Sequence, residues 1–277
     1  MKTIKKFYLI LTVSLFLTNC SHDSIDSETQ NTDFPQEIVL QDVDIPMEPL
    51  ADIGAVALTG FPKTIKKFEN GILKYWAQYY YRPDGNLIKV NYGYDYPKSE
   101  SDELTNAYQY DSEGKMVKYF GNNNEYNFYW DNGRIIWADV YNLLWPVENN
   151  IFYEYNDQGQ IIQKKENHDV TDTGYSHSTF TKYSYYENGN LKLIEYYSWN
   201  RELGAYGWTG ITTFDGYNKD ENLFFEEEII PGQHVQHQFP TSKTKGDYME
   251  TYYYEYDTNG KVMAKAYANN KVTYDYY

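Results

Sequence analysis

The chain has 277 residues, of which 41% are hydrophobic and 19% are aromatic, and tyrosine alone supplies 33. So many β-favouring aromatic residues exclude a disordered chain. The formal net charge of -16 disfavours nucleic-acid binding, because such a surface repels phosphate backbones. The single cysteine, Cys20, excludes an internal disulfide and a zinc knuckle.

Residues 1–19 are predicted to form a signal peptide, with three lysines before an apolar run over residues 7–17. That run is shorter than the roughly 20 apolar residues needed to cross a bilayer. The segment Leu17-Thr18-Asn19-Cys20 resembles the lipobox of bacterial lipoproteins, although that family usually has Gly, Ala or Ser where Asn19 stands. The resemblance implies that Cys20 is lipidated and holds the protein to the outer membrane, facing either side. An ordinary signal peptide with a chance cysteine is the alternative.

Residues 20–62 are predicted to be the lipid anchor and an acidic tether. Residues 21–62 contain nine acidic residues and neither lysine nor arginine. The first part of this stretch is rich in Ser, Thr, Asp and Gln, which favours a solvated, extended chain.

Residues 63–277 are predicted to be one repeat domain. Between residues 68 and 263 one motif recurs: an aromatic residue, a short polar turn ending in glycine, one further residue, and then aliphatic residues. The turn glycines of the seven intact copies are Gly71, Gly85, Gly114, Gly133, Gly159, Gly189 and Gly260. An eighth copy, from Tyr217 to Leu223, has Glu221 where glycine is expected.

The turn sequences predict β-hairpins. Asn-Gly at 70–71, 132–133 and 188–189 favours a two-residue type I′ turn, which needs positive φ at both positions. The remaining copies fit a longer turn, a type I turn followed by a glycine bulge. Because all these glycines close equivalent hairpins, we expect them at one end of the sheet, with the longer connections at the other end.

The recurring motif resembles the YD (RHS-type) repeats of bacterial surface proteins and the related MORN-variant repeats. The resemblance covers most of residues 65–277 and implies an array of β-hairpins. About sixteen strands follow from eight hairpins. We therefore predict an all-β fold, an antiparallel up-and-down meander that is strongly curved or barrel-like. Lysine and glutamate within the strands argue against a barrel that spans a membrane.

No catalytic residue, metal site or cofactor is predicted. His234 and His237 form the one close histidine pair but lack a third ligand. The segment 218–222 has the alternate oxygens of a calcium loop but lacks its glycine and distal glutamate. Glu226 and Glu228 can face the same side of a strand, which leaves a carboxylate hydrolase open. A serine–histidine triad also stays open, because it is defined in space.

The aromatic side chains give the remaining site prediction. Trp137, Trp145, Trp199 and Trp208 lie in or near the longer connections, where they either stack on ligands or cover the ends of the sheet. The sequence thus predicts a non-enzymatic, lipid-anchored envelope protein that serves as a binding or structural scaffold. Its expected partners are the membrane, through Cys20, and a glycan or another envelope protein. A glycan-binding surface lipoprotein is the main alternative, and a hydrolase is the third.

Overall fold

The computed structural model describes residues 60–94, 104–145, 148–170, 175–222, 228–233 and 237–277. Within these ranges the chain forms seventeen β-strands in one antiparallel sheet and no helix. The strands are β1 (Pro62–Glu69), β2 (Ile72–Tyr81), β3 (Leu87–Tyr94), β4 (Leu104–Tyr110), β5 (Met116–Gly121), β6 (Asn124–Asp131), β7 (Arg134–Asn142), β8 (Glu148–Tyr155), β9 (Ile161–Val170), β10 (Tyr175–Tyr185), β11 (Leu191–Asn200), β12 (Ala205–Glu221), β13 (Gln238–Lys245), β14 (Tyr248–Thr251), β15 (Tyr253–Tyr256), β16 (Val262–Tyr267) and β17 (Asn270–Tyr276).

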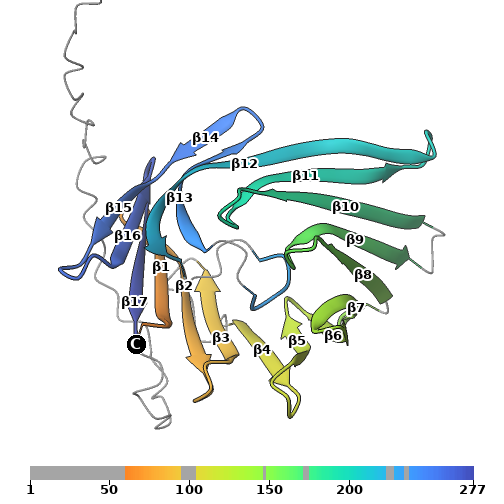
Figure 1. Ribbon diagram of the computed structural model, residues 1–277, viewed down its shortest axis with the longest axis horizontal. Coiled ribbons are helices and arrows are strands. Elements are labelled where there is room, and N and C mark those ends of the chain that lie inside the picture. Colours follow the sequence, from red (N-terminus) through yellow and green to blue (C-terminus); the bar gives the residue numbers. More distant parts are fainter. Residues whose placement is uncertain (1–59, 95–103, 146–147, 171–174, 223–227, 234–236) are drawn as a thin grey trace, which may run out of the picture. The chain divides into compact units, whose positions relative to one another are not determined.

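The sheet is an up-and-down meander that curls into a nearly closed barrel. Strands that are consecutive in sequence pair with each other, and β1 also pairs with β17, which lies beside it in Figure 1. Tyr252 alone separates β14 from β15; β14 pairs with β13, and β15 pairs with β16. The all-β meander predicted from the repeated turns is therefore confirmed.

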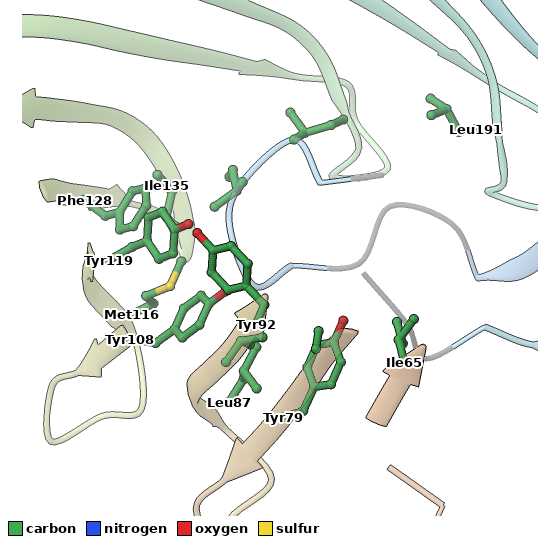
Figure 2. Close-up of a cluster of buried hydrophobic side chains, with 14 of the residues drawn as sticks. Ile65, Tyr79, Leu87, Tyr92, Tyr108, Met116, Tyr119, Phe128, Ile135 and Leu191 are labelled. Carbon is green, nitrogen blue, oxygen red and sulfur yellow. The ribbon is translucent and has the colours of Figure 1, made fainter. Parts of the chain in front are cut away.

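Alternation along the strands divides each one into an inward and an outward set of side chains. The inward sets share one hydrophobic core that extends around the barrel. Figure 2 labels ten of its members: Ile65, Tyr79, Leu87, Tyr92, Tyr108, Met116, Tyr119, Phe128, Ile135 and Leu191. Because the core belongs to the inside of the barrel, the side chains between its members point outward.

Two of the Asn-Gly turns have the expected two-residue form. Asn70 and Gly71 have φ of 50° and 79°, and Asn132 and Gly133 have φ of 47° and 76°. Both values are positive in each pair, as a type I′ turn requires.

The Asn-Gly pair at 188–189 was expected to form the same turn, and this was wrong. Only Gly189 has positive φ, and its amide donates to the carbonyl of Tyr186 at 2.9 Å. The amide of Tyr186 donates to the carbonyl of Asn190, which makes this the longer turn also found at residues 82–86. In both turns the third residue, Asn188 or Asp84, accepts a bond from the amide two positions later.

The other longer turns cap themselves through their first residue. In residues 111–115 the Asp111 carboxylate accepts bonds from the amides of Glu113 and Lys115, both at 2.9 Å. Asn156 and Asp257 make the equivalent pairs of bonds. The side chain at the turn's start thus satisfies two backbone donors that the bulge leaves unpaired.

Aromatic residues at the ends of the strands connect each hairpin to the one before it. Tyr110, Trp130, Tyr155, Tyr185 and Tyr276 donate to backbone carbonyls at 2.7–2.8 Å. Each acceptor is the second residue after a turn glycine, and the acceptors are Leu87, Met116, Ile135, Ile161 and Val262. Tyr217 makes the same bond to the carbonyl of Leu191. This explains why the motif contains Tyr or Trp, which can donate such a bond. The aliphatic residue two places after glycine is explained by burial, since Leu87, Met116 and Ile135 lie in the core.

Three further expectations about the connections were wrong. The turn at Gly71 joins β1 to β2 and therefore lies at the opposite end of the barrel from the other six turn glycines. Residues 138–150 and 164–178, which lie between turns of the repeat and were counted among the longer connections, are mostly strand, because β7 to β10 extend further than the repeat suggested. The eighth copy of the motif, from Tyr217 to Leu223, does not form a tight hairpin. Strand β12 continues to Glu221, and β13 begins only at Gln238.

Candidate functional site: an aromatic row on the outer face

A row of paired side chains crosses the outer face of the barrel from β6 to β12. Each member lies directly opposite the next in the register of neighbouring strands. In order, the members are Tyr129, Trp137, Phe152, Lys165, Phe180, Tyr197 and Trp208. We call these seven residues the aromatic row. They point outward because their neighbours along the strands, such as Ala138, Ile151 and Tyr153, are buried in the core.

Two groups of rings in the aromatic row make contacts across the strands. The ring centroids of Tyr129 and Trp137 lie 4.8 Å apart in an edge-to-face arrangement, and those of Trp137 and Phe152 lie 6.0 Å apart. Phe180 and Tyr197 stack at 4.4 Å with an interplanar angle of 7°. Such contacts hold the rings in fixed orientations on a rigid sheet.

The two ends of the aromatic row are the most open to solvent. Tyr129 is 43% exposed and Trp208 is 60% exposed, and Trp137 is 37% exposed. A large apolar side chain with this exposure has faces that a ligand can reach. The row therefore presents both ordered rings and accessible ring surface.

Polar pairs border the aromatic row on the side of the β7–β8 connection. Asp139 and Asn150 lie opposite each other, and the Asn150 amide donates to the Asp139 carboxylate at 3.0 Å. The Tyr129 hydroxyl donates to the other Asp139 oxygen at 2.8 Å, and this bond raises the pKa of Tyr129. Beside Phe180, Ser178 donates to Asn167 at 2.8 Å.

Polar pairs also border the row on the side of the glycine turns. The Gln163 amide donates to the Glu154 carboxylate at 2.9 Å, and Lys182 lies opposite Glu195. The Lys182 ammonium is 5.4 Å from the ring centroid of Tyr197, and the Tyr197 hydroxyl donates to Glu195 at 3.1 Å. The aromatic row, in which Lys165 on β9 separates two groups of rings, thus runs between hydrogen-bonding and charged groups.

The four tryptophans predicted from the sequence occupy different places. Trp137 and Trp208 belong to the aromatic row and lie within strands, not in connections. Trp199 lies beside the row, with its ring centroid 5.2 Å from that of Tyr206. Trp145 follows β7 outside the row and is 68% exposed.

Sequence reasoning missed most of the aromatic row. Phe152, Phe180 and Tyr197 each stand between inward-facing residues on their strands, which is a visible signal. However, only the strand register places them opposite one another, and the sequence does not give that register. The bulges next to Trp130 and Tyr197 shift the pairing further.

Inside the barrel, residues 228–233 of the connection between β12 and β13 pack against the inward-facing side chains. Ile229 and Ile230 are buried in the core. A Cβ atom at Gly232, whose φ is 73°, would lie 2.8 Å from the ring of Tyr108. A cavity of about 240 Å³ remains beside this segment, lined by residues of the turns at 155–161 and 185–189 and by Ile229, Ile230, Gln233 and His237.

Glu228 occupies an unusual position on this inner segment. The residue as a whole keeps contact with solvent, and its carboxylate accepts a bond from the Gly232 amide at 3.3 Å. Protein atoms surround it on the inside of the barrel, and this desolvation raises the pKa of Glu228 to about 7. Burial likewise raises the pKa of the nearby Tyr79 and Tyr108. Phenols with raised pKa values are poor general bases, so Tyr79 and Tyr108 do not supply a second catalytic base.

The remaining sequence candidates have structural contacts or lie outside the described ranges. Asn218 accepts a bond from the Phe239 amide at 3.3 Å, which ties β12 to β13. The His237 amide donates to Asn190 at 3.1 Å. Cys20, His234 and Glu226 lie outside the described residues. In the part of the chain that the structure describes, no three His, Cys, Asp or Glu residues are grouped to hold a metal ion.

A membrane-spanning helix is absent from the described ranges, where no helix is long and apolar enough to cross a bilayer.

Two solved structures of porin-like proteins match the chain. A porin-like protein from Bacteroides uniformis ATCC 8492 has a TM-score of 0.53 and 12% sequence identity to this chain. The match covers 79% of this chain and 99% of that protein's chain. A porin-like protein from Bacteroides vulgatus ATCC 8482 also has 12% identity, with a TM-score of 0.41, and covers 65% of this chain and 95% of its own. At this identity the first likeness shows a shared fold.

The other two comparisons, which use the sequence, found no relatives. No family model matches the chain, and no curated protein matches it. The resemblance of the hairpin motif to YD repeats therefore stays a prediction.

Proposed function

We propose that the protein is a non-enzymatic binding protein of the bacterial cell envelope, anchored through lipidated Cys20. The observation that carries this proposal is the aromatic row, an exposed and ordered line of rings on a rigid barrel. Binding residues are commonly displayed in this way on a scaffold that does not itself change. The fold shared with a porin-like protein is consistent with a place in the envelope.

The inner face of the barrel favours binding over hydrolysis. A carboxylate hydrolase needs two neighbouring acids, one of which remains ionised. Tyrosines surround Glu228 within the described ranges, and burial raises the pKa of both Tyr79 and Tyr108. Glu166 also faces the interior, where burial and the charge of Glu166 raise the pKa of Tyr153, and its carboxylate pairs with the Lys164 ammonium at 2.5 Å. This ion pair and the phenols around Glu228 suit a structural interior better than a hydrolytic centre.

The outer face favours a barrel that stands beside a membrane. The positions on both sides of the aromatic row carry Asp139, Glu154, Lys182 and Glu195. A lipid-facing band would need apolar residues at these outward positions over a height of roughly 25 Å. The anchor therefore has to come from outside the barrel, and Cys20 supplies it in this proposal.

The anchor is tested by a Cys20→Ala variant expressed in a Gram-negative host. We expect the wild-type protein in the membrane fraction and the variant in the soluble fraction, because several acyl chains on one cysteine bind a bilayer far more firmly than an unmodified terminus. Mass spectrometry of the N-terminal peptide checks lipidation directly. A neighbouring Ser21→Ala variant is the control and should stay in the membrane fraction. Equal partitioning of the wild-type and Cys20→Ala proteins would refute the anchor.

A further inference from the structure

We infer that the aromatic row is the binding site for a neutral, linear glycan that lies across β6 to β12. This inference rests on the proposed binding function and names its ligand class. The row extends over seven adjacent strands, which at roughly 4.8 Å per strand is about 29 Å. That length accommodates a chain of several sugar units, whereas a single monosaccharide would contact one or two members.

The chemistry of the row and its borders matches the two kinds of surface on a sugar chain. The C–H faces of sugar rings pack on aromatic rings, and Trp208, Tyr129 and Trp137 offer exposed ring surface. Sugar hydroxyls need donors and acceptors on either side of that contact. The Asp139–Asn150 pair provides them along one border, and the Glu154–Gln163 pair provides them along the other.

The bordering groups are already held in place by bonds to one another. Asp139 is fixed by the Tyr129 hydroxyl and by Asn150, and Glu195 is fixed by the Tyr197 hydroxyl. A ligand therefore meets side chains whose conformational entropy has largely been lost on folding, which favours binding.

The negative charge of the protein predicts which class of glycan binds. The chain has a formal net charge of -16, and the borders of the aromatic row carry Asp139, Glu154 and Glu195. Lys165 and Lys182 offset only part of this charge locally. An anionic polysaccharide would be repelled, so a neutral polysaccharide fits best.

The width of the row disfavours the other two classes of partner. A stable protein interface buries roughly 800 Å² on each partner and has a broad apolar centre. Here the apolar strip is one residue wide at β7 to β9, with Asp139 and Glu154 on either side, and Tyr206 and Trp199 widen it at β10 to β12. A lipid surface is disfavoured for the same reason, because Asp139 and Glu154 would be drawn into the hydrocarbon region.

The test uses the full-length wild-type protein in detergent and affinity electrophoresis through gels that contain a single polysaccharide. The probes are four neutral polymers (amylose, laminarin, xylan and galactomannan) and two anionic ones (alginate and polygalacturonate). We expect at least one neutral polymer to retard the protein and neither anionic polymer to do so. Binding by an anionic polymer alone, or by none of the six, would overturn the inference.

Substitutions then locate the site. A Trp137→Ala/Trp208→Ala double variant should lose at least tenfold in affinity for the retarding polymer, because it removes two ring faces from the row. Trp145→Ala is the control, since it removes a tryptophan outside the row that is at least as exposed as Trp137 and Trp208, and it should bind like the wild-type protein. Equal losses in both variants would contradict the assignment. Circular dichroism and thermal melts of each variant confirm that it is folded.

Two controls separate this inference from its alternatives. Sedimentation of the Cys20→Ala protein with phosphatidylethanolamine vesicles tests a lipid surface, and co-sedimentation that depends on Trp137 and Trp208 would replace the glycan by lipid. Glycan binding is measured in detergent and does not depend on the anchor. A protein that binds a neutral glycan without being lipidated would therefore overturn the anchor alone, and a lipidated protein that binds none would overturn this inference alone.

Discussion

Gly232 and Gly133 both require positive φ, but their surroundings differ. A Cβ at Gly232 would meet the buried ring of Tyr108 at 2.8 Å, whereas a Cβ at Gly133 would have nothing within 4 Å. We expect Gly133→Ala to cost about 1–2 kcal/mol of unfolding free energy, from backbone strain alone. Gly232→Ala should cost about 1–3 kcal/mol more, because the core also has to shift. Urea unfolding of both variants measures the difference, and equal losses would show that residues 228–233 do not pack inside the barrel.

Glu228 should make stability depend on pH with a defined sign. Its folded pKa of about 7 lies above the ordinary value of 4.5, so the folded state holds the proton more tightly. Its stabilising contribution is complete below pH 4.5 and declines as the pH rises to about 7. In Glu228→Gln this decline is absent, so the stability of the variant relative to wild type should rise over that interval. Urea unfolding at half-unit steps of pH measures the difference, and a constant difference would contradict a raised pKa.

At the scale of the elements, neighbouring hairpins are joined by side chain to backbone bonds as well as by the sheet. Tyr155 and Tyr153 on β8 show the contrast. The Tyr155 hydroxyl donates to the carbonyl of Ile135 at 2.7 Å. The Tyr153 hydroxyl is buried and, among the described residues, has no hydrogen-bond partner.

The same substitution should therefore act in different ways at these two positions. Tyr155→Phe leaves the Ile135 carbonyl without its side-chain donor and should cost about 1–2 kcal/mol of unfolding free energy. Tyr153→Phe removes an unpaired buried hydroxyl and should be neutral or stabilise the fold by up to about 1 kcal/mol. Chemical denaturation of the two single variants measures this. If Tyr153→Phe were the more destabilising change, the Tyr155–Ile135 bond would not stabilise the connection between the hairpins.

At the scale of the whole molecule, the meeting of β1 and β17 makes one cooperative unit of the ring. Tyr274 lies on β17 opposite Ile65 of β1, and its side chain is fully buried. The amide of Tyr277 donates to the carbonyl of Phe61 at 3.1 Å, and its hydroxyl donates to the carbonyl of Tyr79 at 2.7 Å. We call these β1–β17 contacts the seam, and their loss should destabilise every strand at once.

A substitution at the seam tests this cooperativity. Tyr274→Ala should cost about 3–5 kcal/mol, the usual range for removing a buried aromatic side chain. Tyr248→Ala, at an exposed hairpin, should change stability by less than about 0.5 kcal/mol. Tryptophan fluorescence and far-UV circular dichroism should report coincident transitions in both variants. Separate transitions in Tyr274→Ala would show that part of the barrel folds without the seam.

The fold could be predicted from the sequence because its signals are local. Glycine at a positive φ and an acid or amide at the start of a turn are visible in residues such as Asp111 and Gly114. The Asn188–Gly189 turn was misjudged because the same dipeptide fits two loop lengths, and the aromatic residue that carries the bond to the previous hairpin is Tyr185, four positions before the glycine.

The candidate site could be predicted only in part. Trp137 and Trp208 are 71 positions apart in sequence, and five residue pairings between strands lie between them. The β8–β9, β10–β11 and β11–β12 pairings also shift at bulges that composition does not reveal. The sequence thus supplies the members of the aromatic row but not their alignment.

The β1–β17 seam holds Gly60 and Tyr277 within hydrogen-bonding distance of each other. The strands could therefore keep their places in the barrel if the chain began and ended elsewhere. A circular permutant could join residue 277 to residue 60 by a short Gly/Ser linker and open the chain at the exposed Asn122–Asn123 turn, where both residues have positive φ. In such a permutant β6 would be synthesised first and β5 last, and the ring would close between them instead of between β1 and β17.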